Sequence, residues 1–567
     1  MAEIGVNRTS TYGACGIVAV LLMMMWLNPF AGGPSPAVMP LVMCWLYSAI
    51  LLIGGSTDRR LLLTLGLIGP LLVVWAFVSG GGGRSWQDIA LFAAGLASIS
   101  IAALWAAGRD SECWLAMSYA WLIAALLSSG LGLCQYFNLA SPMAPWVNVP
   151  PVGEAFANLR QRNQFASLTN IGLLALLWFV AQERIRAFAL PMAMLLAAGN
   201  AASASRTGIL QLFLITALTW FWQTPRCSRL LGLCVGAVLA YFVSALSLPW
   251  LLQLISGTAG NNVFGRLAGE SGCNSRMVLW SNVLELIRQR PLLGWGLNEL
   301  DYAHYIHLYR GPRFCEILDN AHNLPLHLAV ELGIPAAAMI CAGSAWLVCR
   351  TKPWRDTDPT RQLAWGGISV ILLHSMLEYP LWYGPFQITF GLCLGLLWVT
   401  SPSAGIAAGR AIGPGRTQKG NRARRVLLTQ ILLAALTVAL LGYSVNSYYR
   451  VSQIYLPPSE RSPTYRENTL EKIRGTWFFQ NQVDFAELSV TGLTPQNAQA
   501  INALATRLLH YSPEPRVIEK VIESAAMLGH DEEALAHLAR YRAAFPEDYF
   551  RWTQLNTRAV DPAPVLK

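Results

Sequence analysis

Long apolar stretches recur along most of this chain, and they constrain its fold more than any other feature. Runs of about 17 to 25 apolar residues follow one another from Thr11 to the vicinity of Asn446, and each is long enough to cross the ~30 Å hydrocarbon core of a bilayer. With 54% hydrophobic and 13% charged residues in 567, the composition is not that of a soluble protein. The sequence therefore predicts an all-α, polytopic membrane helix bundle of about 13 spans.

The expected spans are 11–30, 37–54, 61–79, 87–107, 113–137, 164–182, 187–202, 206–222, 227–252, 323–349, 362–379, 384–400 and 426–446. The first run has no small-x-small cleavage site and more spans follow it at once, so we expect a retained anchor, not a signal peptide. A cytoplasmic N-terminus satisfies the positive-inside rule, because it places most loop arginines in the cytoplasm. Those loops contain Arg59, Arg60, Arg109, Arg184, Arg186, Arg350 and the basic stretch 410–425.

On the outer side, the loop at about 253–320 is much longer than an ordinary connection. A helical pattern from Ser275 to Ile287, with Arg276 near its start, is followed by a glycine-containing turn, and this order suggests a lid. Cys273 and Cys315 also lie in this loop, where they either form a disulfide or remain isolated thiols. The other nine cysteines lie in or beside spans, where cysteine usually acts as a small apolar residue.

After this loop the polar chain meets an apolar helix, and His322 stands at the junction. Asn323 fits an N-cap and Pro325 is tolerated in a first helical turn, so His322 should lie just before a helix N-terminus. The positive end of the helix dipole disfavours imidazolium, which leaves a neutral ring able to accept a proton. The alternative is that His322 only hydrogen-bonds the loop. His327 and Glu331 are four residues apart and are expected to pair in a structural role.

A second candidate cluster, Arg160-Gln161-Arg162-Asn163, enters a helix from an outer loop. Two guanidinium groups beside free helical N–H groups form a natural anion site that suits a pyrophosphate. Basic residues at a membrane surface also bind lipid head groups, and the sequence leaves this alternative open.

Two further stretches carry polar residues at the outer ends of spans. Arg206 sits between small residues, and a charge so placed is costly unless it is paired, faces water or snorkels to the interface. His374 and Glu378 are spaced i and i+4 on a helix that must end before a proline, which leaves Tyr379 and Tyr383 at the outer surface. These tyrosines either bind sugar or phosphate or belong to an interfacial aromatic belt.

From residue 447 onward the composition becomes that of a soluble, helical domain. Amphipathic helices are expected at Asn497–His510, Glu514–Leu528, Asp531–Phe545 and from Pro546, similar to tetratricopeptide-type hairpins, which usually bind proteins. We therefore expect two domains, a transmembrane domain of residues 1–446 that includes the outer loop and an outer helical domain of residues 447–567.

The motifs, taken in order, resemble the bacterial O-antigen ligase and polymerase superfamily. The resemblance rests on Gln161 to Ala166, Ser205 to Gly208, Arg290 to Gly296, Ala321 to Gly333 and His374 to Pro380. Within that group the Gln-Arg-Asn-Gln entry, the Glu-Tyr-Pro-Leu stretch and the C-terminal helical domain look most like the protein O-oligosaccharyltransferases.

The resemblance implies a multi-pass enzyme of the bacterial inner membrane that transfers a glycan en bloc from undecaprenyl-diphosphate to serine or threonine hydroxyls of exported proteins such as pilins. It implies no cofactor, no nucleotide, no required metal and no nucleic-acid partner. By this resemblance, His322 would be the essential histidine, and Arg162 and Arg206 would bind the diphosphate. Gln161 and Tyr379 would be further site residues. The resemblance supports Arg276 as a site residue less strongly. Alternatives are a ligase acting on lipid A core, an O-antigen polymerase, and a lipid-linked glycan transporter.

Overall fold

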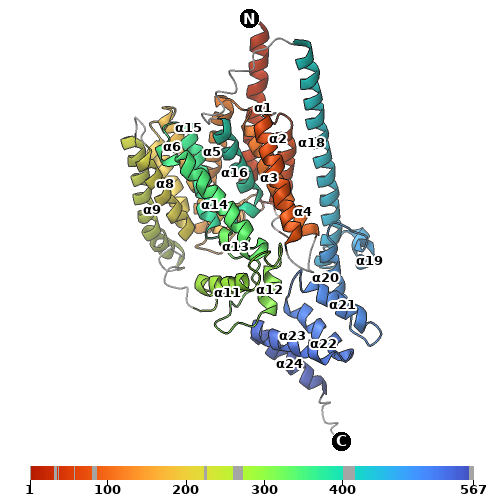
Figure 1. Cartoon of the computed structure of the whole chain (residues 1–567). Coiled ribbons are helices and arrows are strands. Elements are labelled where there is room, and N and C mark those ends of the chain that lie inside the picture. Colours follow the sequence, from red (N-terminus) through yellow and green to blue (C-terminus); the bar gives the residue numbers. More distant parts are fainter. Residues whose placement is uncertain are drawn as a thin grey trace. The chain divides into compact units, whose positions relative to one another are not determined.

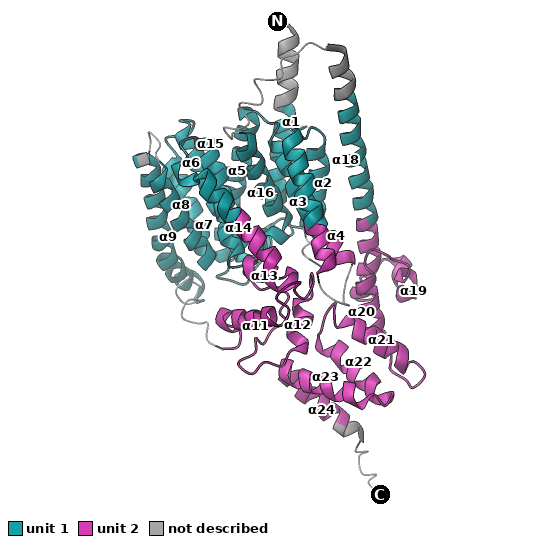
Figure 2. Ribbon diagram, viewed as in Figure 1, with its two compact units in different colours: residues 1–71, 92–269, 344–443 teal, residues 72–91, 270–343, 444–567 magenta. Residues whose placement is uncertain are grey.

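The computed structural model describes residues 2–30, 35, 38–56, 58–79, 86–222, 227–258, 272–399 and 416–560, and these ranges contain helices but no β-strand (Figure 1). The described residues confirm the predicted all-α fold. Contacts divide the chain into two compact units, coloured separately in Figure 2. Unit 1 comprises residues 1–71, 92–269 and 344–443, and unit 2 comprises residues 72–91, 270–343 and 444–567.

Unit 1 is built from apolar helices that overlap the predicted spans. They are α1 (Ala2–Leu27), α2 (Val38–Leu52), α3 (Arg59–Val78), α4 (Trp86–Ala106), α5 (Ser111–Tyr136), α6 (Arg162–Ala181), α7 (Ala189–Ala202), α8 (Arg206–Phe221), α9 (Cys227–Ser256), α14 (Ile334–Thr351), α15 (Pro359–Ser375), α16 (Gly384–Val399) and α18 (Arg416–Ser452). Of these, α3, α4, α14 and α18 continue into unit 2. Part of the basic stretch 410–425 lies outside the described residues.

Among the described residues, seven helices are long and apolar enough to cross a membrane: 59–78, 86–106, 111–136, 162–181, 228–256, 334–355 and 423–455. Five shorter apolar helices lie at 15–27, 38–52, 189–202, 206–221 and 384–399, and α15 is in neither group. The chain is thus a multi-pass membrane protein, and the count of about 13 spans stays a prediction.

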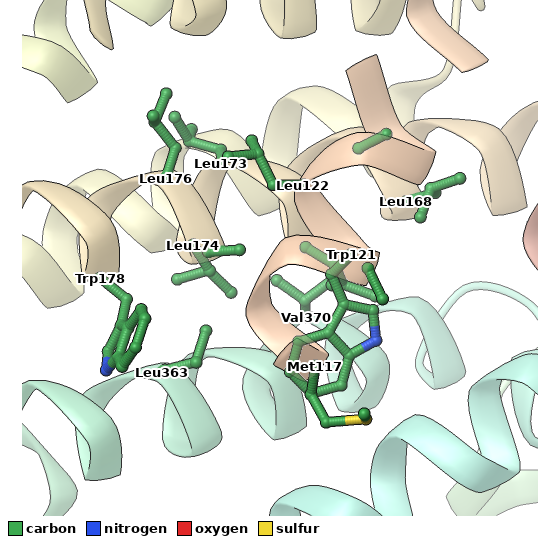
Figure 3. Close-up of a cluster of buried hydrophobic side chains, with 14 of the residues drawn as sticks. Met117, Trp121, Leu122, Leu168, Leu173, Leu174, Leu176, Trp178, Leu363 and Val370 are labelled. Atoms are coloured by element: carbon green, nitrogen blue, oxygen red, sulfur yellow. The ribbon is translucent and has the colours of Figure 1, made fainter. Parts of the chain in front are cut away.

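The core of unit 1 is organised around α6, which is buried along its whole apolar length and contacts α5, α7, α8 and α15. Figure 3 shows Met117 and Trp121 of α5 among leucines of α6 and residues of α15. Small residues let these helices approach closely, since a Cβ added at Gly172 would lie 2.2 Å from the Cβ of Ala125. This close packing fixes the end of α6 at which the candidate arginines lie.

Unit 2 contains shorter helices with amphipathic packing. They are α11 (Arg276–Gln289), α12 (Leu300–Ile306), α13 (Leu324–Leu332), α19 (Thr469–Ile473), α20 (Gln480–Val490), α21 (Ala498–Leu508), α22 (Pro515–Met527), α23 (Asp531–Ala544) and α24 (Pro546–Val560). The predicted loop helix and the four predicted C-terminal helices are confirmed within a few residues. Consecutive helices from α20 to α24 contact one another, and the tetratricopeptide comparison stays a prediction.

One expected span is wrong in form. Residues 323–349 are not a single helix but α13 and α14, separated at Gly333. This residue has a positive φ of 86°, and a Cβ there would lie 2.1 Å from the carbonyl oxygen of Leu292. Only glycine tolerates both conditions, so the chain breaks here and α13 belongs with the long loop that precedes it. Glu378 is also not helical, because α15 ends at Ser375 and a turn follows.

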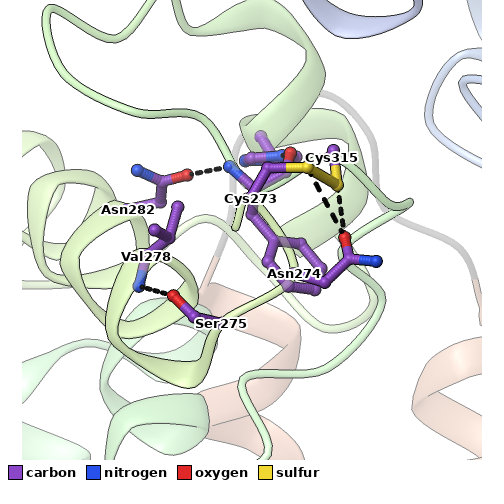
Figure 4. Close-up of a disulfide and its surroundings, with 8 residues drawn as sticks. Cys273, Asn274, Ser275, Val278, Asn282 and Cys315 are labelled. Carbon is purple, nitrogen blue, oxygen red and sulfur yellow. Dashed lines mark hydrogen bonds between the residues drawn. A yellow bond between two sulfur atoms is a disulfide. The ribbon is translucent and has the colours of Figure 1, made fainter. Parts of the chain in front are cut away.

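The structure resolves the alternatives for the loop cysteines, because Cys273 and Cys315 form a disulfide with Cα atoms 5.4 Å apart (Figure 4). Asn282 of α11 supports the same connection, since its side chain accepts from Phe314 N at 2.8 Å and donates to Pro312 O at 3.0 Å. A second disulfide joins Cys15 and Cys113, so these two of the nine cysteines in or beside spans depart from the usual role of a small apolar residue. Both of those residues face the interior between α1 and α5, which the sequence pattern did not reveal.

Candidate functional site

The N-termini of α6 and α8 lie together in unit 1, and each begins with a candidate arginine. Gln161 caps α6 by accepting from Gln164 N at 2.6 Å, so Arg162 is the first helical residue. Ser205 caps α8 by accepting from Gly208 N at 3.0 Å, so Arg206 takes the same position there. Two positive helix ends and two guanidinium groups therefore share one edge of the bundle.

Asn163 joins three elements at this edge. Its Oδ1 accepts from the Ser205 hydroxyl at 2.6 Å, and its Nδ2 donates to Glu378 Oε1 at 3.3 Å. The first turn of α6, the cap of α8 and the turn after α15 are thereby tied to one side chain. The fold brings Arg162, Asn163, Arg206 and Glu378 into one neighbourhood, although more than 200 positions separate the first from the last in the sequence.

Glu154, a residue that sequence reasoning missed, forms a salt bridge with Arg162. Both side chains are about a quarter exposed or less, so the pair is partly shielded from water. The signal in the sequence was weak, because Glu154 lies in the irregular segment before α6 and belongs to no motif. An incoming anion at Arg162 would compete with this carboxylate, which makes the pair a natural point of control over binding.

Arg160 differs from the other two arginines. Its backbone has a positive φ of 59°, and its guanidinium donates to the carbonyl oxygens of Pro29 and Phe30 after α1. Partial burial lowers the pKa of this group from its ordinary value. These contacts indicate a structural role for Arg160, because they attach the loop before α6 to the segment that follows α1.

A buried polar network continues from this edge into the bundle. The Ser167 hydroxyl contacts His374 Nδ1 at 2.9 Å, and Gln211 Nε2 donates to Ser167 Oγ at 2.8 Å and to Val370 O at 3.0 Å. Asn170 donates to Gly208 O at 3.0 Å. Buried polar groups that satisfy one another fix the relative position of helices, so this network holds α6, α8 and α15 in register beneath the arginines.

Tyr379 and Tyr383 follow the same turn. Their rings stack with centroids 5.9 Å apart, and Tyr379 also contacts the exposed Trp382 edge to face. The helix ends before Pro380, as predicted. Both tyrosines are half-buried beside the exposed Trp382, and such an aromatic group fits both a sugar platform and an interfacial belt.

His322 belongs to unit 2, where the backbone around it is closely held. Its φ is +50°, its N–H donates to Asn320 Oδ1 at 2.9 Å, and Trp280 of α11 donates to the carbonyl oxygen of Ala321 at 3.1 Å. A left-handed conformation in a residue other than glycine persists only where its surroundings impose it. Asn323 caps α13 by accepting from Leu326 N at 3.1 Å, so the predicted position just before a helix N-terminus is confirmed.

The predicted pair of His327 with Glu331 is confirmed, with Nε2 and Oε2 3.3 Å apart on α13. Burial lowers the pKa of His327 to about 3 and raises the pKa of Glu331 well above its usual range, so both groups are held neutral. Glu331 Oε1 also accepts from Asn298 N at 2.9 Å. The pair therefore braces α13 against the preceding turn.

Arg276, the weaker candidate, is the first residue of α11, whose N-cap Ser275 accepts from Val278 N at 3.3 Å. Arg276 and His322 are both in unit 2, whereas Arg162, Arg206, Tyr379 and Tyr383 are in unit 1. Within the described ranges, no group of three His, Cys, Asp or Glu side chains is arranged to hold a metal ion.

Three family models match parts of the chain. One described as a protein glycosylation ligase matches residues 155–179, one described as an O-antigen ligase matches residues 191–341, and one described as the C-terminal part of a virulence factor membrane-bound polymerase matches residues 362–559. The first contains Arg162, the second contains Arg206 and His322, and the third contains Tyr379 together with the C-terminal helices.

A curated relative is also similar to this chain. It is a general O-oligosaccharyltransferase of Acinetobacter baylyi (strain ATCC 33305 / BD413 / ADP1), 26% identical over 298 residues. The match covers 50% of this chain and 50% of the relative, so the chain spans about half the length of the relative that it matches. These findings confirm the resemblance to O-antigen ligases and protein glycosylation ligases, and they support a glycosyltransferase-type membrane enzyme.

Proposed function

We propose that this chain, a multi-pass membrane protein similar to glycan ligases and to an O-oligosaccharyltransferase, transfers a glycan en bloc from undecaprenyl-diphosphate to serine or threonine hydroxyls of exported proteins such as pilin. The proposed reaction takes place at the periplasmic face of the bacterial inner membrane and uses neither a nucleotide nor a metal. The observation that carries the proposal is the pairing of the α6 and α8 N-termini through Asn163, with Arg162 and Arg206 as their first residues.

The donor in this reaction carries two phosphates, and the charges at the two helix ends match it. Guanidinium groups bind phosphate oxygens with two parallel hydrogen bonds, and backbone N–H groups of a first helical turn add further donors. Charge on the leaving diphosphate grows as the glycosidic bond breaks, so these groups bind the transition state more tightly than the ground state. Electrostatic stabilisation of the leaving group is therefore the main catalytic contribution in this proposal.

The acceptor hydroxyl supplies the nucleophile. Its oxygen forms a bond to the anomeric carbon while the bond from that carbon to the phosphate oxygen breaks, and the electron pair leaves on the diphosphate. We assign the hydroxyl proton to His322, whose left-handed backbone and position just before α13 hold the residue in place. Diphosphate is already a good leaving group, so no general acid is assigned.

A second candidate function is ligation or polymerisation of O-antigen, with a sugar hydroxyl as acceptor. The matches to an O-antigen ligase and to a membrane-bound polymerase favour it, and the chemistry at the anomeric carbon would be the same. The match to a protein glycosylation ligase at the entry of α6 and the similarity to a general O-oligosaccharyltransferase favour a protein acceptor.

The test is expression in a glycosylation-deficient Gram-negative host that makes an undecaprenyl-linked glycan, with a pilin-like protein and lipid A core both present. The proposal predicts glycan on the pilin-like protein, lost in His322→Ala. Glycan on lipid A core alone would establish the ligase, and longer lipid-linked chains with neither acceptor modified would establish the polymerase. Unchanged glycans throughout would refute a transferase.

A matched histidine variant controls for expression and folding. His530 is exposed at the start of α23 and pairs only at the surface, with Glu533 at 3.4 Å. His530→Ala should transfer glycan as the wild type does, because a surface ion pair contributes little to stability. Equal loss of transfer in both variants would remove the assignment of His322 as the base.

A further inference from the structure

A cavity of about 260 Å³ opens in unit 1 at the opposite end of α6 from Arg162. It is lined by residues at the end of α4, the start of α5, the end of α6, the start of α15 and the end of α16. Since α6 has 20 residues that each rise about 1.5 Å, the cavity lies about 30 Å from the arginine edge. It is thus separate from the candidate site.

The walls of the cavity combine apolar and charged side chains. Trp114 and Trp178 contribute aromatic surface, and Trp178 Nε1 is held by Thr360 Oγ1 at 3.2 Å. Arg109 and Arg184 contribute positive charge, and neither pairs with a carboxylate within the part of the chain that the structure describes. The cavity is therefore amphiphilic, with cationic groups left available to a ligand.

Arg109 is held in place at the wall of the cavity by contacts with its neighbours. Its guanidinium lies 4.6 Å from the centroid of the Trp105 ring and donates to Gly54 O, yet its Nε is buried without a hydrogen-bond partner among the described residues. These contacts fix the position of the guanidinium beside the cavity.

Negative charge is also present, on Asp110 and Asp358. Each caps a helix through Oδ1, Asp110 by accepting from Cys113 N at 3.2 Å and Asp358 by accepting from Thr360 N at 2.9 Å. Their positions are fixed by these caps, so the two carboxylates remain beside the two arginines without neutralising them through ion pairs. A ligand that contacts both the arginines and the carboxylates must therefore carry a negative and a positive charge.

The position of the cavity indicates that such a ligand comes from the membrane. Five apolar helices end or begin at its walls, and in a membrane protein this level is the boundary between hydrocarbon and head groups. Tryptophan is enriched at that level, and arginine there pairs with lipid phosphate. The positive-inside pattern assigns Arg109 and Arg184 to the cytoplasmic side.

From these observations we infer that this cavity binds the head group of a zwitterionic phospholipid, a phosphate diester bearing a primary ammonium. Arg109 and Arg184 bind the phosphate, Asp358 binds the ammonium, and the tryptophans contact the glycerol and upper acyl carbons. The inference does not depend on the proposed glycan transfer, because it concerns binding at the far end of the bundle.

Lipid retention tests the inference directly. The purified full-length chain is incubated with mixed micelles of equal amounts of phosphatidylethanolamine, phosphatidylglycerol and phosphatidylcholine, and bound lipid is identified by native mass spectrometry. The wild type should retain phosphatidylethanolamine in preference to the other two. Retention of phosphatidylglycerol to the same extent would show that the cavity only binds anionic phosphate, and this result would overturn the inference.

Two variants and one control locate the site. Arg184→Ala should lower phosphatidylethanolamine retention about tenfold, the effect of losing a charge-assisted hydrogen bond. Asp358→Asn keeps a cap on α15 and should abolish the preference over phosphatidylglycerol. Arg186→Ala, two residues away, removes an exposed arginine that pairs with Glu183 at 2.6 Å and does not line the cavity, and it should change nothing.

A competition experiment with a soluble ligand distinguishes a lipid from a free metabolite. O-phosphoethanolamine at millimolar concentration should compete weakly with phosphatidylethanolamine, because it has the charges but not the acyl chains. Complete displacement at concentrations near that of the lipid would contradict a membrane ligand. Retention that is identical in the wild type, Arg184→Ala and Arg186→Ala would also overturn the inference, since Arg184 is exposed and its loss should not unfold the chain.

Discussion

The hydroxyl of Ser205 donates to Oδ1 of Asn163 at 2.6 Å, and this contact joins the cap of α8 to the first turn of α6. The same serine accepts from Gly208 N, so one side chain both caps a helix and fixes it to its neighbour. The positions of Arg162 and Arg206 depend on this arrangement. It is the part of the candidate site that the motifs alone did not connect.

Asn163→Ala should therefore weaken transfer without unfolding the chain. The variant leaves Ser205 and Glu378 without their shared partner, and each lost hydrogen bond costs about 1 kcal/mol. We expect glycan transfer to fall about tenfold, with a higher donor KM, in a reconstituted assay. Asn556→Ala, at an exposed position of α24, is the control, and an equal loss there would argue against a specific role for Asn163.

Arg206→Ala should lower kcat/KM for the donor about 100-fold, as removal of a preorganised charge-stabilising donor typically does. Arg206→Lys should recover little of this, because an ammonium cannot form two parallel hydrogen bonds to phosphate. Steady-state kinetics with a defined lipid-diphosphate donor make the comparison, with exposed Arg551→Ala as the reference. Full activity of Arg206→Lys would mean that only the charge is needed.

Gly172→Ala should destabilise the bundle although it adds a single methyl group. The new Cβ would lie 2.2 Å from Ala125 Cβ, so α5 and α6 must separate, at a cost of about 1–3 kcal/mol. Gly130→Ala is the matched control, because nothing lies within 4 Å of its added Cβ and alanine favours a helix. Gly172→Ala should have a lower unfolding temperature in detergent than the wild type and Gly130→Ala. Equal unfolding temperatures would contradict the close packing of α5 and α6.

Unit 2 should lose stability in acid through its buried histidines. Burial lowers the pKa of His304 to about 3 and that of His537 to about 4, whereas both are near 6.5 in the unfolded chain. The unfolded state therefore binds more protons below pH 6.5, and stability falls as the pH drops from there toward 4. His304→Gln should flatten this dependence in thermal unfolding at pH 7, 6 and 5, and an unchanged slope would exclude His304 as its origin.

The positions of the helices could be read from the sequence because hydrophobic length and helix caps are local properties. Asn323 as the cap of α13 and the helices from α21 to α24 were found in this way. The break at Gly333 was missed, because it depends on the carbonyl of Leu292, which the chain brings close only in three dimensions. The Cys15 to Cys113 pair was missed for the same reason.

The candidate site shows the same division. Arg162 and Arg206 were identified from their neighbours in sequence, since arginine at the end of an apolar helix is unusual by itself. Glu154 and Asn163 gain their importance from partners in other segments, Arg162 for the first and Ser205 for the second. Sequence periodicity contains no information on such partners.

Glycan transfer in a defined system tests the proposed function most directly. The purified chain is reconstituted in liposomes with an undecaprenyl-diphosphate-linked oligosaccharide and a pilin-like acceptor protein, and the acceptor mass is measured for wild type, His322→Ala and His530→Ala. The proposed function predicts an acceptor heavier by one whole glycan with wild type and His530→Ala, and no shift with His322→Ala. An unmodified acceptor with the wild type, or full transfer by His322→Ala, would contradict it.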